Sequence, residues 1–247
     1  MTREDVYTAY FDTYRHQKVD LPDYNVVKAN EFKTDYPGVA VKNLFPLVAE
    51  ERMQKDEDEI ELTKKAIALT KDGLCNVMAN LKPGMKEYQA QANYEHVLYY
   101  QGTEGPSFPT IAGSGKNGCM LHYETNRDTC ADGSLLLLDL GCRVDGYCSD
   151  ITRTYPVNGK FTDRQRAVYE IQNAMHLESV KALRPGIPYM SVYELSARVM
   201  VEGMKELGLM KGNAEDAVRE GAHALFYPHG LGHMMGLDVH DMENFGE

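Results

Sequence analysis

Hydrophobic residues return at helical spacing from residue 56 to residue 81. The positions are Ile60, Ile67, Leu74 and Leu81, with Val77 and Met78 on the same side. This spacing predicts one amphipathic helix of about six turns. The acidic run DEDEIE suits its start, because the helix dipole favours negative charge there. Lys82-Pro83-Gly84 ends the helix, since proline cannot continue it.

A second helix is predicted from residue 87 to residue 100, followed by a loop at PSFPTIAGSGKNG. A similar arrangement returns about a hundred positions later. Thr162 and Gln165 form a capping box before a helix that ends at LRPG. Ser191 and Glu194 form another before a helix that runs to about Leu207. Because LKPG and LRPG occupy matching places, the pattern suggests a domain with two related halves.

Residues 135–157, LLLLDLGCRVDGYCSDITRTYPV, hold two strand-like runs around Asp-Gly. Asp-Gly between such runs is the strongest short-range hairpin signal. A two-residue turn pairs Val144 with Tyr147. The same register pairs Asp139 with Thr152 and points Asp139 and Asp150 the same way. A three-residue turn would reverse this parity.

Two carboxylates that face each other are costly beside an apolar strand. The run LLLL before Asp139 is typical of a buried strand, and burial of unpaired like charges raises a pKa or requires a cation. The alternative is that Asp139 and Asp150 are both solvated on an exposed sheet face. Cys142 and Cys148 fall on opposite faces of the hairpin, which argues against a disulfide between them.

A second chemical motif, PHGLGHMMGLDVHD, occupies residues 228–241. The intervening glycines disfavour a helix, and an extended segment places His229 and His233 on one face because their separation is even. Asp238 and His240 share a face for the same reason. Ordinary solvated histidines in a loop are the alternative. Carboxylates with imidazoles describe a site for Mn²⁺, Co²⁺ or Zn²⁺, and two such ions can acidify a shared water and polarise a carbonyl.

Composition narrows the class of protein. The 247 residues carry a net charge of −11, with 43% hydrophobic and 26% charged residues, which is ordinary for a globular protein. With no basic run longer than two residues, we expect no nucleic-acid partner. With no long apolar run and no signal-peptide core, we expect a cytoplasmic protein and no membrane partner. Five cysteines without C-x-x-C indicate neither a disulfide framework nor a zinc ribbon.

The two motifs, in this order and spacing, resemble the aminopeptidase P and prolidase branch of the pita-bread metallopeptidases. The resemblance runs from about Arg52 to the end of the chain and includes HYETN, GKFTDRQRAVYE and LRPG. It implies an α+β pita-bread fold of two pseudo-symmetric halves, each a helix pair over curved antiparallel strands. It also implies removal of an N-terminal residue that precedes proline, usually with Mn²⁺, so that proline-containing peptides are the expected partners. The full-length form is expected to be a homodimer or larger.

The resemblance also implies roles for individual residues. Asp139, Asp150 and His233 match metal ligands of a dinuclear site, and Thr152 would support them. His229 and His240 match catalytic histidines that orient the scissile carbonyl and stabilise the tetrahedral intermediate. His122 matches a histidine that lines the substrate pocket. The expected site therefore consists of His122, Asp139, Asp150, His229, His233 and His240.

The sequence departs from the family pattern at both ends. The family carries a full domain before Arg52 and two further glutamate ligands after D-V-H-D, one of them in T-x-E-P-G. Glu243 and Glu247 stand too early and in the wrong context. We therefore interpret residues 1–50 as a remnant of the N-terminal domain and linker, and residues 51–247 as a catalytic domain without its last strands. Alone, it is expected to be inactive and to hold two metal ions poorly.

Several alternatives remain open within and beyond this branch. A prolidase would cleave only Xaa-Pro dipeptides. A non-catalytic pita-bread module would bind peptides or proteins, although such relatives have typically lost the ligands that are retained here. Metal-free hydrolysis of the creatinase kind would not need all these ligand types. Methionine aminopeptidase shares the scaffold, but D-V-H-D and D-x-T-R-T are more similar to the proline-specific branch.

Overall fold

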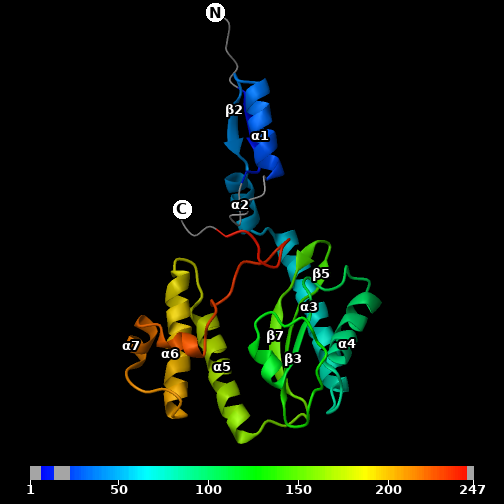
Figure 1. The fold of residues 1–247 in the computed structure, drawn as a ribbon, viewed down its shortest axis with the longest axis vertical. Helices are drawn as coiled ribbons and strands as arrows, with labels where there is room; N and C mark the ends of the chain where they lie inside the picture. Colours follow the sequence, from blue (N-terminus) through cyan, green and yellow to red (C-terminus); the bar gives the residue numbers. More distant parts are fainter. Residues whose placement is uncertain (1–6, 14–22, 244–247) are drawn as a thin grey trace, which may run out of the picture.

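The computed structural model describes residues 7–13 and 23–243. A small unit leads the chain and stands away from the rest of the molecule (Figure 1). In it, β1 (Thr8–Phe11) pairs in parallel with β2 (Ala40–Asn43), with α1 (Tyr24–Asp35) between them. Parallel strands need such a crossover connection. Helix α2 (Phe45–Met53) then leads into the larger part of the molecule.

The first helix pair consists of α3 (Glu57–Asn80) and α4 (Glu87–Tyr100), as the hydrophobic spacing predicts. Asp56 caps α3 and forms a capping box with Glu59. The amide of Leu81 closes the last turn on the carbonyl of Val77. Gly84 then takes a left-handed conformation with φ 89°, which glycine adopts without strain.

A three-stranded antiparallel sheet packs against this helix pair. Its order is β3 (Ile111–Ser114), β4 (Leu135–Leu140) and β7 (Ile151–Pro156). A short hairpin, β5 (Arg143–Val144) and β6 (Tyr147–Cys148), extends beyond β4 and β7. Leu136, Leu138 and Leu140 are fully buried on one sheet face, in one core with Tyr94 and Leu98 of α4. The opposite face of β4 is only half-buried, so the run LLLL is not buried on both sides.

The second helix pair repeats the arrangement on the other side of the molecule (Figure 1). Thr162 caps α5 (Asp163–Ala182) in the predicted capping box with Gln165. Helices α6 (Tyr189–Glu206) and α7 (Ala214–Arg219) follow, and then the 3₁₀ helix η2 (Ala222–Leu225). The 3₁₀ helix η1 (Gly115–Cys119) belongs to the first half, directly after β3. A separate core holds this half together, and its members are Met175, Ala197, Met200, Val201, Met204, Ala214 and Tyr227.

The joints of the two helix pairs have the same backbone conformation. Leu81 and Leu183 end their helices with φ −63°, ψ 126° and φ −66°, ψ 119°. Gly84 and Gly186 follow with φ 89° and 86°. The predicted internal repeat is therefore confirmed in the backbone, because LKPG and LRPG build the same turn.

The buried face of α3 matches the predicted one only in part: Leu74 and Val77 are buried as predicted. Ile60 and Ile67 are 41% and 39% exposed, whereas Ala66, Thr70 and Gly73 are buried. The contact is made by small residues, since the ring of Tyr94 occupies the space that a side chain at Gly73 would need. Residues spaced seven apart also rotate gradually around a helix of 3.6 residues per turn, so they do not all stay on one face. The predicted apolar positions thus identified the helix and the C-terminal part of its packed face, but not the part near Ile60 and Ile67.

Two further local predictions were wrong. The stretch 106–118 contains β3 and part of η1, not only a loop, because β3 gains its structure by pairing with β4. Ser191 does not cap α6: that helix begins at Tyr189 after Pro188, and the Ser191 hydroxyl donates to the carbonyl of Pro188. The boundary of α6 near Leu207 is confirmed.

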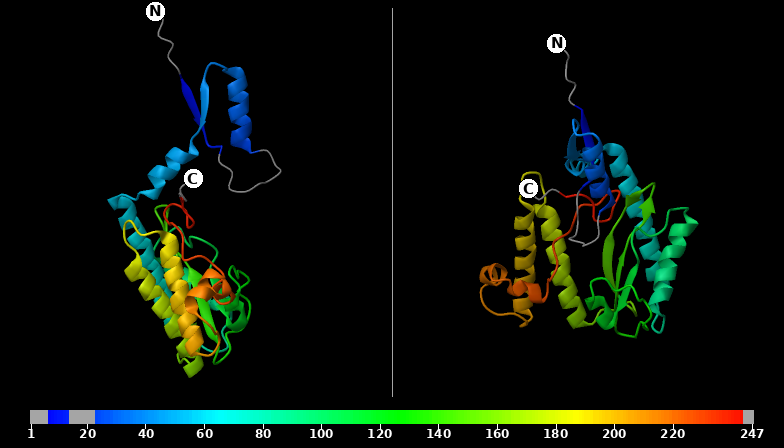
Figure 2. Two further views of the ribbon diagram at one scale, coloured as in Figure 1. Left: turned by 90° about the vertical axis from the view of Figure 1, so that its left-hand side faces the viewer. Right: turned by 45° about the horizontal axis from the view of Figure 1, so that its top comes forward.

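Residues 226–243 run back across the molecule without a helix or strand (Figure 2). They leave the α6 side and reach the start of α3, where the amide of Cys148 donates to the carbonyl of Gly236 at 2.8 Å. The C-terminal segment therefore connects the two halves. Within the described chain, no helix combines the length and apolar character needed to cross a membrane.

Candidate metal centre

The aspartate hairpin has the predicted register. Asp139 pairs with Thr152, and Val144 pairs with Tyr147. The turn residues Asp145 and Gly146 have φ 49° and 87°, the positive values that a type I′ turn requires. Since this turn fixes the parity of both strands, it directs Asp139 and Asp150 to the same side.

Asp139 and Asp150 interact across that face. Thr152 donates its hydroxyl to Asp139 Oδ1 at 2.9 Å. Burial raises the pKa of Asp139, and the nearby carboxylate of Asp150 raises it further, against the opposing hydrogen bond from Thr152. Two carboxylates this close favour either a shared proton or a bound cation. The hairpin thus supplies an acceptor pair on a half-buried sheet face, between the buried and the solvated alternatives that the sequence left open.

His233 reaches this pair from the C-terminal segment. Its Nε2 lies 3.2 Å from Asp150 Oδ2, and its Nδ1 lies 2.9 Å from the carbonyl oxygen of Met234. The hydrogen bond with Asp150 raises the pKa of His233 to about 9, although burial opposes it. A histidine held at one nitrogen by a carbonyl presents its other nitrogen in a fixed direction, as metal-binding histidines do.

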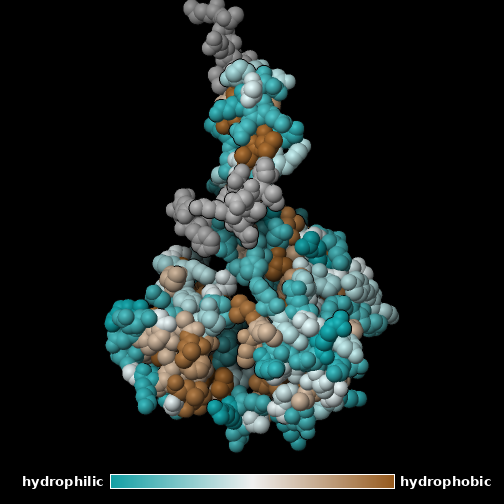
Figure 3. All heavy atoms as spheres, in the orientation of Figure 1, coloured by the Kyte–Doolittle hydropathy of each residue, from teal (hydrophilic) through white to brown (hydrophobic). Residues whose placement is uncertain are grey.

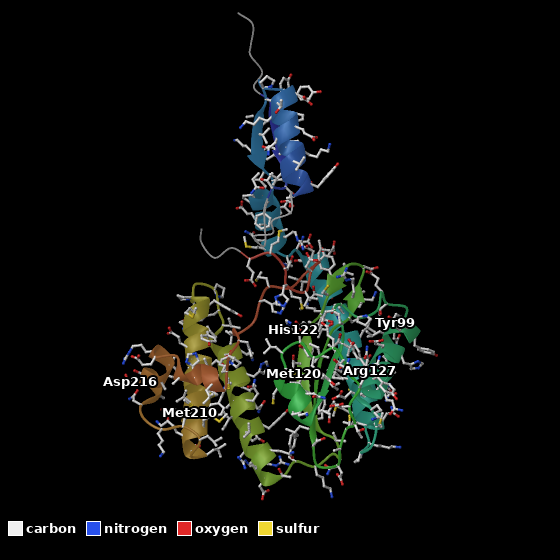
Figure 4. The ribbon with its side chains drawn as sticks, in the orientation of Figure 1. Tyr99, Met120, His122, Arg127, Met210 and Asp216 are labelled. Atoms are coloured by element: carbon white, nitrogen blue, oxygen red, sulfur yellow. The ribbon has the colours of Figure 1, made fainter. Side chains whose placement is uncertain are left out.

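Two more histidines complete the cluster. The ring of His240 stacks on that of His233, with 3.8 Å between centroids and 16° between planes. Burial lowers the pKa of His240, and the neighbouring rings of His233 and His122 lower it further. His122 also acts electrostatically on Asp139. Figure 4 shows His122 between the two halves of the molecule, on the side of the sheet.

The structure does not bring His229 into this cluster. Its ring packs edge-on against Tyr227 at 4.9 Å between centroids, and its Nδ1 lies 2.9 Å from the carbonyl of Gly230. These contacts are local to residues 227–230, and the side chain is exposed. Five of the six predicted site residues therefore converge, and His229 lies apart.

Sequence reasoning missed a buried carboxylate that holds the His122 loop. Glu87 is fully buried and accepts from the amides of Ser114 and Asp128 at 2.7 and 2.9 Å. It also accepts from the Tyr123 hydroxyl at 2.7 Å and from Asn117 at 3.0 Å. In the sequence, Glu87 has no signal that separates it from an ordinary acidic residue at a helix start.

Sequence reasoning also missed the residues that hold the C-terminal segment. Arg52 donates to Asp238 at 2.8 Å and pairs with Asp241, and Lys55 donates to Asp241 at 2.7 Å. Tyr147 of the hairpin donates to Glu59 of α3 at 2.7 Å. These contacts join parts of the chain that are far apart in sequence, so no local pattern could indicate them.

The donor chemistry of this site fits a divalent cation. Asp139 and Asp150 repel one another without a positive partner, and His233 presents Nε2 to the same carboxylate. Within residues 7–13 and 23–243, no group of three His, Cys, Asp or Glu side chains is close enough in this structure to hold a metal ion. Binding would therefore have to draw the pair and the imidazole together, replacing the direct contact of His233 with Asp150.

Comparisons with known proteins identify relatives of this chain. The chain is 41% identical over 202 residues to the Xaa-Pro aminopeptidase of Escherichia coli K12, covering 82% of this chain and 46% of that protein. The Xaa-Pro aminopeptidase of Haemophilus influenzae is 36% identical over 202 residues, with 82% and 47% covered. The chain thus spans about half the length of the curated relatives that it matches.

Solved structures give the same result for the fold. Aminopeptidase P from E. coli with the inhibitor Pro-Leu superposes with a TM-score of 0.88 at 36% identity, covering 97% of this chain and 55% of that one. The α+β pita-bread fold is therefore confirmed. A model of metallopeptidase family M24 matches residues 61–247. The chain, homologous to Xaa-Pro aminopeptidases, belongs to metallopeptidase family M24.

Proposed function

We propose that the protein containing this chain is a metal-dependent exopeptidase that hydrolyses the Xaa-Pro bond at peptide N-termini. The observation that carries the proposal is the convergence of Asp139, Asp150, His233, His240 and His122 from three distant stretches of the chain. Relatives of this chain carry the name Xaa-Pro aminopeptidase. One of the similar structures has the inhibitor Pro-Leu bound.

In this proposal, Asp139, Asp150 and His233 hold the metal. Bound divalent ions would acidify a water molecule and polarise the scissile carbonyl. Mn²⁺ is the ion we propose, with Co²⁺ and Zn²⁺ as other borderline ions that suit carboxylate and imidazole ligands. A Zn-substituted E. coli aminopeptidase P with product has a TM-score of 0.86 to this chain at 36% identity, covering 97% of this chain and 55% of that one.

The remaining residues bind and orient the peptide. Thr152 fixes Asp139 by donating to Oδ1, which leaves Oδ2 for a further partner. His240, stacked on His233, is placed to donate a hydrogen bond to the carbonyl oxygen of the peptide. His122 acts electrostatically on Asp139, and in this proposal it lines the pocket that takes the peptide. His229 would have to move toward the cluster to contact the same peptide.

Metal binding by the chain is the first test. We expect Mn²⁺ to bind by isothermal titration and to raise the melting temperature, because a ligand of the native state stabilises that state. Asp150→Ala should abolish both effects, since it removes the partner of Asp139 and His233. Asp72→Ala, at an exposed position of α3, is the matched control and should keep Mn²⁺ binding. Equal binding by wild type and Asp150→Ala would contradict the assignment.

Peptide hydrolysis by the native gene product is the second test. With Mn²⁺, we expect release of the first residue from Xaa-Pro-Yaa peptides and none from matched Xaa-Ala-Yaa peptides. Cleavage of Xaa-Pro dipeptides alone would identify a prolidase instead. Binding of peptides without cleavage would identify a non-catalytic module.

A further inference from the structure

A charged junction lies where the N-terminal unit meets the larger part of the molecule. Arg52, in the last turn of α2, contacts both Asp238 and Asp241. Lys55, just before α3, donates to Asp241 at 2.7 Å and to the carbonyl of Arg52 at 2.6 Å. The Asp241 side chain is 1% exposed, so this is a buried carboxylate with two cationic partners.

The backbone around Asp241 forms a closed loop. The amide of Asp241 donates to the carbonyl of Met234 at 3.0 Å, and the amide of Gly236 donates to that of Asp238 at 3.0 Å. A side chain at Gly236 would collide with Asp241 Oδ2 and with Lys55 Cε. Glycine is therefore required at 236 for the loop to close around the carboxylate.

This loop sets the separation of the two stacked histidines. His233 precedes it and His240 ends it, one residue before Asp241. The stacking of the rings requires the segment from His233 to His240 to fold back on itself. Cys148 holds the middle of the loop at the carbonyls of Gly236 and Leu237, and Glu243 accepts from the Met234 amide. The His240 end is held by Asp241 and its cationic partners.

We propose that Arg52 and Lys55 are positioning residues that act through Asp241 to hold His240 against His233. The proposal rests on the proposed function for its kinetic consequence, but its structural part stands independently of peptide hydrolysis. Arg52 and Lys55 touch neither the carboxylate pair nor the histidines. They act through the buried carboxylate, because loss of either cation leaves Asp241 partly unpaired and weakens the loop closure.

Hydrogen exchange of residues 230–241 is the structural measurement. In Lys55→Met, we expect exchange of this segment to rise about tenfold, since Asp241 then keeps only Arg52 as a cationic partner and the segment opens more easily. Lys64→Met is the matched control, because Lys64 lies on α3 and pairs only with exposed Glu61. It should leave the exchange unchanged. Lys55→Arg retains the charge and should restore at least half of the protection.

Proton NMR of the metal-free protein tests the histidines directly. Stacking shifts the ring protons of His240 through the ring current of His233, and we expect this shift to be lost in Lys55→Met. Should that variant fail to fold, Asp238→Asn serves instead, because it removes only the exposed contact of Arg52. It should raise exchange about two- to threefold, by loosening one end of the loop.

Kinetics of the native gene product with Mn²⁺ complete the test. We expect Lys55→Met to lower kcat about tenfold with KM within about threefold of wild type, as for a group aligned only in the transition state. Unchanged exchange and an unchanged His240 shift in a folded Lys55→Met protein would overturn the positioning role. Absence of hydrolysis in wild type would instead refute the proposed function, while exchange and NMR would still decide the role of Lys55.

Discussion

The two helix pairs share one joint but pack in different surroundings. In the first half, α3 and α4 lie against a sheet, and a buried carboxylate fixes the loop that carries His122. In the second half, α5 and α6 pack around methionines, and no strand follows Pro156 among the described residues. Figure 3 shows apolar surface over this second half. Its helices expose Leu177, Val180 and Met190 by 47%, 55% and 63%.

The difference separates what local sequence controls from what packing controls. Matching PG turns produce matching joints with or without a sheet. The carboxylates of the site lie on paired strands, whereas His233 and His240 lie on irregular backbone that is held by ion pairs. One half of the site is thus fixed by strand register, and the other by contacts between distant parts of the chain.

The largest expected effect is the loss of the buried carboxylate in the first half. Glu87→Ala leaves two amides, the Tyr123 hydroxyl and Asn117 without their acceptor. We expect the free energy of unfolding to fall by about 4 kcal/mol, because unsatisfied buried donors are costly. Urea denaturation would measure it. Glu194→Ala, at an exposed position of α6, should change little, and a similar loss there would erase the distinction between the halves.

The ion pairs of the C-terminal segment should respond to acid. Burial alone would raise the pKa of Asp241, but the Lys55 hydrogen bond and the charges of Lys55 and Arg52 lower it below its usual range. Its stabilising contribution is therefore present above the ordinary aspartate pKa and is lost as pH falls through the lowered value. Asp241→Asn should cost about 3 kcal/mol at neutral pH, as for one partner of a buried ion pair.

Denaturation at several pH values would measure this difference. The free energy of unfolding of wild type should exceed that of Asp241→Asn by a constant amount above about pH 5. This difference should shrink as the wild-type carboxylate becomes protonated. A gap that does not change with pH would mean that the charge of Asp241 contributes nothing. Asp216→Asn, in an exposed pair with Arg219, is the control and should show almost no gap.

Close helix contact should be more demanding in the first half than in the second. An added methyl at Gly73 meets the ring of fully buried Tyr94, while one at Gly203 meets the side chain of Ile171, which is only partly buried. We expect Gly73→Ala to lower stability by about 2 kcal/mol through overpacking. Gly203→Ala should cost less than about 1 kcal/mol, since Ile171 can shift and alanine favours the helix. Melting curves in which Gly203→Ala is the more destabilised variant would contradict this difference between the two halves.

The smallest expected effect separates a real helix cap from an apparent one. The Thr162 hydroxyl accepts from the Gln165 amide, whereas the Ser191 hydroxyl bonds only within the first turn region. Thr162→Ala should lower the free energy of unfolding by about 1 kcal/mol, and Ser191→Ala should lower it by less than about 0.5 kcal/mol. Equal costs in chemical denaturation would show that Ser191 stabilises α6 in another way.

The features that the sequence could predict depend on neighbours along the chain. Helix α3, its end at Pro83 and the type I′ turn at Asp145-Gly146 all follow from short-range rules. The turn carries the prediction furthest, because one local conformation sets the register that joins Asp139 to Thr152. The two aspartates could therefore be placed from sequence alone.

The features that could not be predicted depend on distant partners. Strand β3 is four residues long and exists by pairing with β4. Besides Leu74 and Val77, the packed face of α3 includes the small residues Ala66, Thr70 and Gly73, and the ring of Tyr94 fills the space beside Gly73. The place of His229, outside the cluster, depends on Tyr227 and the irregular backbone after α7. The motif that contains His229 identifies the residue but not the contacts that decide its place.

The contact between Arg52 and Asp241 joins residues 189 positions apart in the sequence. Closing so long a loop costs more chain entropy than forming either helix pair, so this contact should form late in folding. During synthesis, the hairpin with Asp139 and Asp150 emerges well before His233 and His240. The order of events therefore keeps the acidic pair incomplete until both halves have folded, and a growing chain cannot assemble the site ahead of its scaffold.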